Sequence, residues 1–131
     1  MGGTLTNFLT IQKNLKKFSK LIYLKNRGFL ENIDGREKIY LKKKINKLNR
    51  KFGGLLNLKK LPSAVIVADC KIDYNAILEA HKLNIPVIGI ADSDANIELV
   101  TVPILVNVKS RKTIVFLLTL ILNLVLKNIL K

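Results

Sequence analysis

The sequence of 131 residues has one cysteine, Cys70, one histidine, His81, and no tryptophan. One cysteine cannot form an internal disulfide or a multi-cysteine zinc site. A single histidine also excludes most catalytic-metal sites, because these use several histidine or cysteine ligands. We therefore expect no cofactor and no metal site, and we assign Cys70 to the core as a small apolar residue.

Acidic residues are also scarce, since 9 Asp and Glu stand against 23 Lys and Arg and give a formal net charge of +14. The imbalance lies in one half of the chain. Residues 1–60 carry 16 basic and 3 acidic side chains (net +13), and residues 61–131 carry 7 and 6 (net +1). Such a basic block points to a polyanion, because each phosphate contact releases counterions. The alternative is a solvated surface that binds no ligand, but such surfaces normally carry positive and negative side chains together.

Two amphipathic helices are predicted in the basic half. From Thr6 to about Lys25, apolar residues recur at steps of three and four, which is typical of one helix face. After the turn residues KNRGFLENIDG, Asp34 and Glu37 form a capping-box pattern that opens a second helix, and a glycine pair at 53–54 ends it. The two apolar stripes are Phe8, Ile11, Leu15, Phe18 and Ile22, and then Leu41, Ile45, Leu48 and Phe52. Together the helices predict an antiparallel hairpin with its lysines turned outward.

The second half predicts a parallel sheet. The segments AVIVAD (64–69) and PVIGIAD (86–92) are typical of buried parallel strands, and TVPILV (101–106) predicts a third strand. A helix is expected over residues 74–84, so that the first two strands and this helix form a right-handed βαβ unit. The chain thus divides into a basic helical hairpin, residues 1–60, and an α/β half-domain that follows it.

Aspartates end two of these strands. Asp69 and Asp92 fall at the sheet edge where α/β folds place ligands. A nucleotide-binding α/β enzyme could use them, with Asp94, around a metal. No glycine-rich phosphate loop accompanies either strand and no nucleophile–base pair is present, so we favour loop caps.

The last segment, TIVFLLTLILNLVLKNILK, is almost wholly apolar over residues 113–126. This run is shorter than the roughly 20 residues that cross a bilayer. We expect no membrane span but a terminal helix packed on the sheet, and its lack of a polar face predicts a further partner. A membrane-associated basic protein anchored by residues 113–130 is the alternative.

Four sequence patterns in this order resemble the family of small-subunit ribosomal protein two. GGTLTNF is similar to the glycine-glycine, threonine-asparagine signature of the family, and RGFLENIDGREK stands where the family has its hairpin tip. KFGGLLNLKKLPSAVIVAD resembles a second signature of the family, in which the end of the hairpin is followed by a double glycine, by Leu-Pro and by a strand that ends in aspartate. ILEAHKLNIPVIGIADSDANIELV follows the Glu-Ala, Ile-Pro, strand and aspartate pattern of the family. The resemblance covers essentially the whole chain.

The chain departs from this family pattern in two places. In the loop PILVNVKSRKTI, Val108 and Lys109 stand where two acidic residues usually follow the asparagine. In the family the glycine pair comes after several strands and helices, whereas here Met1 directly precedes it. We therefore expect a partial doubly wound (flavodoxin-like) parallel sheet with an inserted antiparallel helical hairpin, completed by another chain that supplies the missing N-terminal part.

The resemblance implies a structural, non-enzymatic protein that binds and braces rRNA beside neighbouring small-subunit ribosomal proteins, near the mRNA exit.

Lysine far exceeds arginine, which suits an A+T-rich gene of the organelle type, so we predict a mitochondrial ribosome, with a plastid ribosome as the alternative. RNA recognition is expected to be largely by shape.

The predicted RNA contacts are glycine backbone, which can approach RNA closely, and basic side chains, which neutralise phosphates. Few aromatic residues lie among the lysines, so base stacking is expected to be minor, and Phe18, Tyr23 and Phe52 are assigned to the hairpin core. The predicted RNA-binding residues are Gly2, Gly3, Thr4, Asn7, Lys13, Lys16, Lys17, Lys20, Lys42, Lys43, Lys44, Lys47, Arg50, Lys51, Lys109, Arg111 and Lys112.

Overall fold

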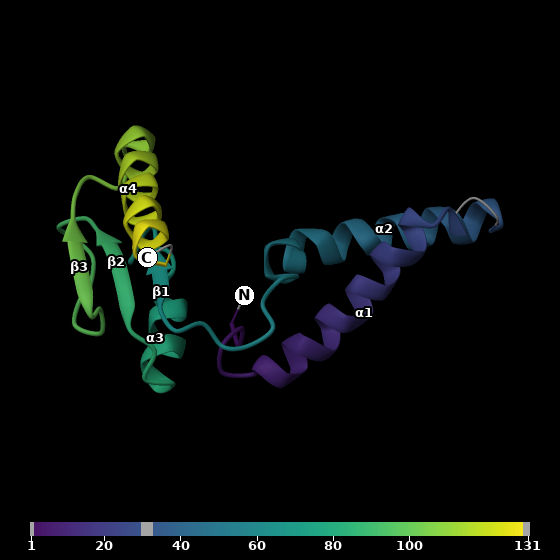
Figure 1. Cartoon of the computed structure of the whole chain (residues 1–131), viewed down its shortest axis with the longest axis horizontal. Coiled ribbons are helices and arrows are strands. Elements are labelled where there is room, and N and C mark those ends of the chain that lie inside the picture. Colours follow the sequence, from purple (N-terminus) through teal and green to yellow (C-terminus); the bar gives the residue numbers. More distant parts are fainter. Residues whose placement is uncertain (1, 30–32, 130–131) are drawn as a thin grey trace. The chain divides into compact units, whose positions relative to one another are not determined.

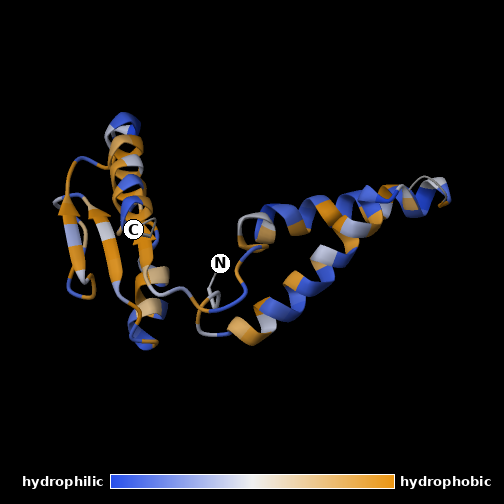
Figure 2. Ribbon diagram, in the orientation of Figure 1, coloured by the Kyte–Doolittle hydropathy of each residue, from blue (hydrophilic) through white to orange (hydrophobic). Residues whose placement is uncertain are grey.

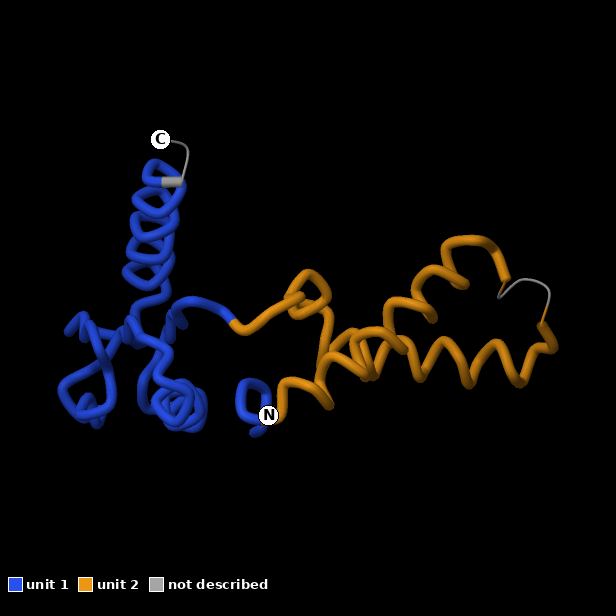
Figure 3. The backbone as a smooth tube through the Cα atoms, turned by 60° about the horizontal axis from the view of Figure 1, so that its bottom comes forward, with its two compact units in different colours: residues 1–6, 62–131 blue, residues 7–61 orange. Residues whose placement is uncertain are grey.

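The computed structural model describes residues 2–29 and 33–129 (Figure 1). The chain forms two compact units, coloured separately in Figure 3. The helical unit comprises residues 7–61, and the sheet unit comprises residues 1–6 and 62–131. The first six residues, which the sequence analysis groups with the hairpin, thus pack in the sheet unit. The predicted hairpin tip includes residues 30–32, which lie outside the described residues.

The described part of the helical unit is built mainly on two long helices, with a short 3-10 helix after the second. Its elements are α1 (Phe8–Asn26), α2 (Gly35–Phe52) and the 3-10 helix η2 (Gly53–Leu55). The buried residues Ile11, Leu15 and Phe18 of α1 and Ile45 and Phe52 of α2 form one apolar cluster. These residues belong to the two predicted stripes, because burial on one side of a helix requires apolar residues at steps of three and four. Figure 2 shows hydrophilic residues along much of both helices.

The ends of α2 follow from two local features. The Asp34 side chain accepts a hydrogen bond from the Gly35 backbone N–H at 2.8 Å, which satisfies one of the free donors at the helix start. At the other end, Gly53 has φ −56° and ψ −43°, so the chain stays right-handed and passes into η2. The predicted end at the glycine pair is correct, but it does not involve a left-handed glycine cap.

The sheet unit contains a three-stranded parallel sheet in the order β1-β2-β3. Its elements are β1 (Val65–Val67), α3 (Tyr74–Lys82), β2 (Val87–Ala91), β3 (Val102–Leu105) and α4 (Arg111–Ile129). The predicted α/β fold with a parallel sheet is confirmed, since α3 connects β1 to β2 and packs against both strands. β1 and β3 each have one neighbouring strand in the described part of the chain.

Cys70 lies at the centre of the sheet unit's core, as predicted, and is fully buried. Burial raises the pKa of its thiol, and the charge of Asp69 raises this pKa further. Close packing here requires glycine in β2, because a Cβ atom at Gly89 would lie 2.5 Å from Cys70 Sγ and 2.8 Å from Val100 Cγ1. The buried residues of this core are Leu5, Val67, Cys70, Ile77, Ala80, Val87, Ala91 and Val100.

The terminal helix α4 differs from its prediction. We expected it to pack on the sheet, but none of its described side chains is buried, and Phe116 is 66% exposed. The burial of α4 is therefore only partial: its half-buried residues Ile114, Leu117, Leu118 and Ile121 recur at helical spacing and mark one partly covered face, while much of the helix is hydrophobic (Figure 2). Among residues 2–29 and 33–129, no helix combines the length and hydropathy that a bilayer crossing requires.

Candidate nucleic-acid interface

The basic surface of the helical unit is formed by side chains that lie outside the buried stripes of α1 and α2. All ten residues predicted there are exposed: Lys13, Lys16, Lys17, Lys20, Lys42, Lys43, Lys44, Lys47, Arg50 and Lys51. Among the described residues, the only ion pair is the one between Lys71 and Asp94 in the sheet unit. The positive charge of α1 and α2 is therefore not neutralised by carboxylates of the described chain, and it is available to an anionic partner.

Two tyrosines add aromatic surface to these helices. Tyr23, predicted to lie in the core, is 54% exposed, and the Arg27 guanidinium carbon lies 4.8 Å from its ring centroid. On α2, the Lys44 ammonium lies 5.7 Å from the ring centroid of Tyr40. Each pair is four residues apart on a helix, which brings the cation over the ring. The prediction for Tyr23 failed because its neighbour Ile22 occupies the inward position, so Tyr23 is turned about 100° away from it.

The glycine turn before α1 is held by a carboxylate from α3. Glu79 accepts hydrogen bonds from the backbone N–H groups of Gly3, Leu5 and Thr6, with the last two at 2.7 and 3.3 Å. Gly3 has φ 82°, in the left-handed region that favours glycine, and the Leu5 side chain is buried in the core. Sequence reasoning missed Glu79 as a site residue, because its partners lie more than 70 positions away.

The ionisation of Glu79 is coupled to this turn. Desolvation by burial works against the charged carboxylate, but the hydrogen bonds from Leu5, Gly3 and Thr6 outweigh it and lower the pKa of Glu79 below its ordinary value. The carboxylate therefore remains charged at neutral pH and fixes the turn conformation. Of the predicted turn residues, Gly2 and Asn7 are exposed, and Gly3 and Thr4 are half-buried.

The loop before α4 carries the remaining predicted RNA contacts. Asn107 Oδ1 accepts a hydrogen bond from the Lys109 backbone N–H at 2.9 Å, so the asparagine stabilises the turn without the usual acidic neighbours. Lys109, Arg111 and Lys112 are all exposed. Positive charges in the first turn of a helix oppose its dipole, so helix stability does not explain Arg111 and Lys112. An anion bound here would compensate for that cost.

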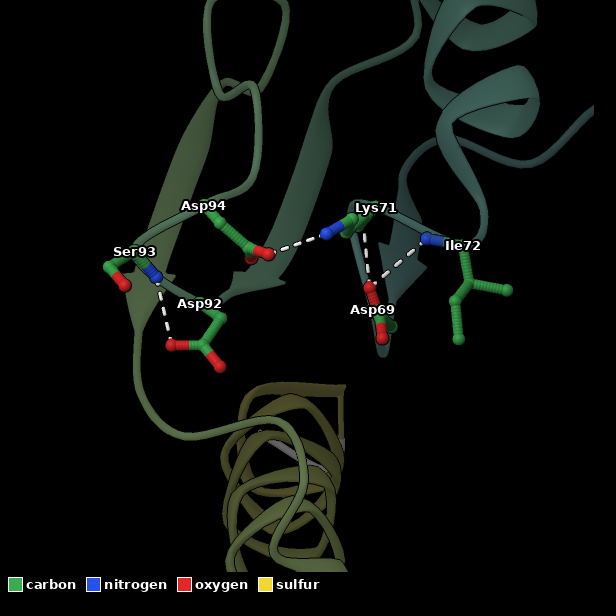
Figure 4. A network of polar contacts seen from close by, with 6 residues as sticks. All are labelled: Asp69, Lys71, Ile72, Asp92, Ser93 and Asp94. Carbon is green, nitrogen blue, oxygen red and sulfur yellow. Dashed lines mark hydrogen bonds and ion pairs between the residues drawn. The ribbon is translucent and has the colours of Figure 1, made fainter.

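The aspartates at the strand ends act as loop caps in the structure (Figure 4). Asp69 Oδ1 accepts hydrogen bonds from the backbone N–H groups of Lys71 and Ile72 at 2.8 and 3.1 Å. Asp92 Oδ1 accepts from the Ser93 N–H at 2.9 Å. Asp94 binds the Lys71 ammonium, and this hydrogen bond and charge lower the pKa of Asp94. In the part of the chain that the structure describes, no group of three or more His, Cys, Asp or Glu side chains is placed to hold a metal ion.

A family model described as Ribosomal protein S2 matches residues 1–128. The chain belongs to the ribosomal protein S2 family.

Individual S2 proteins are similar over most of the chain. Small ribosomal subunit protein uS2 of Malacoplasma penetrans is 40% identical over 121 residues, which are 92% of this chain and 33% of that protein. The uS2 protein of Ureaplasma parvum is 41% identical over 118 residues, 90% of this chain and 34% of its own length. The uS2 protein of Nocardia farcinica is 40% identical over 104 residues, 79% and 36% respectively. The chain spans about a third of the length of these curated S2 relatives.

The source of these S2 relatives corrects one prediction. All three are bacterial proteins, so the similarity points to a bacterial ribosome, and the predicted mitochondrial ribosome and its plastid alternative are wrong. The prediction failed because an excess of lysine over arginine reflects the base composition of a gene. That composition does not distinguish an organelle from a bacterium.

Proposed function

We propose that this S2-family chain is a structural, non-enzymatic component of a bacterial small ribosomal subunit, where it binds and braces rRNA beside neighbouring ribosomal proteins. The observation that carries the proposal is the set of exposed basic side chains on α1 and α2, which form no ion pair with any carboxylate of the described residues. Lysines of this kind bind phosphates as point charges and release counterions from the RNA. Rigid helices hold the charges at fixed spacing, which suits recognition of RNA by its shape.

The glycine turn and the α4 loop are the further proposed RNA contacts. Gly2 is exposed and carries no side chain, so its backbone can come close to a phosphate. Glu79 occupies the N–H groups of Gly3, Leu5 and Thr6, which leaves RNA to meet the outer side of this turn. Lys109, Arg111 and Lys112 would add phosphate contacts from the sheet unit.

Further protein of the S2 fold is the proposed partner of the sheet unit. α4 exposes apolar side chains along its length, including Val115, Phe116 and Leu122. Within residues 2–29 and 33–129, β1 pairs with β2 alone, and an open parallel edge offers free backbone donors and acceptors. We propose that another polypeptide segment pairs with β1 and covers α4.

Co-sedimentation tests the proposal. The full chain is mixed with bacterial small-subunit rRNA and the other small-subunit proteins, and the particles are separated on a sucrose gradient. We expect the chain to sediment with the small subunit and to be released as salt is raised. A chain that stays at the top of the gradient at low salt would overturn the proposed function.

A further inference from the structure

A groove of about 540 Å³ lies within the helical unit, between α1 and the segment that follows η2. Its size falls within the roughly 300–1,000 Å³ range of small-ligand sites. The groove is lined by Gln12, Leu15, Lys16, Ser19, Lys20, Leu56, Leu58 and Lys59.

The lining residues combine positively charged lysines with apolar leucines. Lys16 and Lys20 come from α1, and Lys59 comes from the other wall. None of the described residues that line the groove carries a carboxylate. Leu15 is buried, but Leu56 is 36% exposed and Leu58 is half-buried, so these two leucines offer an apolar surface that a ligand can reach.

A hydrogen bond ties the two walls together. The Gln12 side-chain amide donates to the backbone carbonyl of Lys59 at 2.7 Å. This bond positions the segment that carries Leu56 and Lys59 against α1, so the groove is part of the folded unit.

We propose that this groove binds one unpaired RNA nucleotide, with its base on the leucines and its flanking phosphates on the lysines. The inference rests on the proposed RNA-binding function and deepens it. Proteins recognise RNA mainly at unpaired nucleotides, whose bases are free to leave the helix. Such a nucleotide presents an apolar ring face between two phosphates, which matches a groove that is lined by leucines together with Lys16 and Lys20 from α1 and Lys59 from the other wall.

The test compares two RNA hairpins that differ only in one bulged nucleotide. Binding of each RNA to the full chain is measured by fluorescence anisotropy at a fixed salt concentration. We expect the bulged RNA to bind about tenfold more tightly, which corresponds to ~1.4 kcal/mol of binding free energy. Leu56→Ser should abolish this preference and leave affinity for the fully paired RNA within about twofold.

Two control variants are matched to the groove. Leu61 is 38% exposed, close to the 36% of Leu56, but does not line the groove, so Leu61→Ser should keep the preference. Lys59→Gln should reduce the preference more than Lys60→Gln, because both remove one exposed charge but only Lys59 lines the groove.

The outcomes separate the two proposals. Equal binding of the bulged and paired RNAs by the unmodified chain would overturn the groove site and leave RNA binding intact. The groove site would also be overturned if Leu56→Ser and Leu61→Ser had equal effects on the preference. The same holds if an acidic peptide displaced the bulged RNA as readily as unlabelled RNA does. Binding of neither RNA at low salt would instead overturn the proposed function.

Discussion

Glu79 on α3 accepts a hydrogen bond from the backbone N–H of Leu5 at 2.7 Å, across 74 positions of sequence. The same carboxylate binds the N–H groups of Gly3 and Thr6. The turn that precedes α1 is therefore built from two distant parts of the chain, with glycine supplying the backbone conformation and Glu79 supplying the acceptor. Without this acceptor, three backbone donors would lose their partner.

We predict that Glu79→Gln lowers the free energy of unfolding by about 1–2 kcal/mol, because hydrogen bonds to a charged group are stronger than those to a neutral amide. Hydrogen exchange of the Gly3, Leu5 and Thr6 amides should become faster. Glu98→Gln is the control, since Glu98 is an exposed glutamate in a loop of the same unit. Equal effects of the two substitutions would show that the contact does not stabilise the turn.

The pH dependence of this effect has a defined sign. The pKa of Glu79 is lower in the folded protein than its ordinary value of 4.5. The charged carboxylate therefore contributes its stability above pH 4.5, and this contribution is lost as the pH falls through the folded pKa. Urea unfolding should show a constant difference between Glu79→Gln and the unmodified chain near neutral pH and a shrinking difference below 4.5. A difference that grows on acidification would contradict the lowered pKa.

Gly89→Ala should destabilise the sheet unit by about 1–3 kcal/mol, because overpacking a core forces its neighbours to move. The added methyl group would lie 2.5 Å from Cys70 Sγ, and both residues are buried. Gly54→Ala is the control, since nothing lies within 4 Å of a Cβ atom at that position. Thermal unfolding of both variants checks the prediction, and an unchanged melting temperature for Gly89→Ala would contradict the packing described.

Replacing Lys42, Lys43, Lys44 and Lys47 together by glutamine should weaken rRNA binding and lower the slope of log affinity against log salt by up to about 3, since each RNA phosphate contact contributes ~0.7–0.9. Filter binding over a salt series measures this slope. The double variant Lys82→Gln with Lys127→Gln removes exposed charges from the sheet unit and should have a smaller effect per charge. Equal effects per charge would mean that binding is not located on α2.

Replacing Phe116 and Leu122 of α4 by serine should reduce self-association of the isolated chain, because contiguous exposed apolar surface favours association. The measurement is analytical ultracentrifugation over a range of protein concentrations. Ile72→Ser is the control, since Ile72 is highly exposed but lies outside α4. If the unmodified chain is monodisperse at every concentration, the proposed covering of α4 by further protein loses its support.

Periodicity predicted the parts of the fold that depend on short-range patterns. Ile11, Leu15 and Phe18 are buried because they share one face of a helix, and this is visible from their spacing alone. The strands of the parallel sheet were likewise predicted from short β-branched runs, and the structure shortens each by one or more residues at its ends.

Contacts between distant residues could not be predicted in this way. Nothing in the local sequence around Glu79 signals that it binds the backbone near the N-terminus, and nothing around Lys59 signals that it faces Lys16 and Lys20 across a groove. The burial of α4 was overestimated for a related reason. An apolar helix must be buried somewhere, but its own sequence does not say which protein segment covers it.

The most direct test of the account is the salt dependence of binding between the full chain and small-subunit rRNA. With ten exposed basic side chains on α1 and α2, we expect log affinity to fall linearly with log salt from about 50 to 500 mM, with a slope of about −4 or steeper. A slope near zero, or no binding at the lowest salt concentration, would contradict the proposal that these side chains bind RNA phosphates.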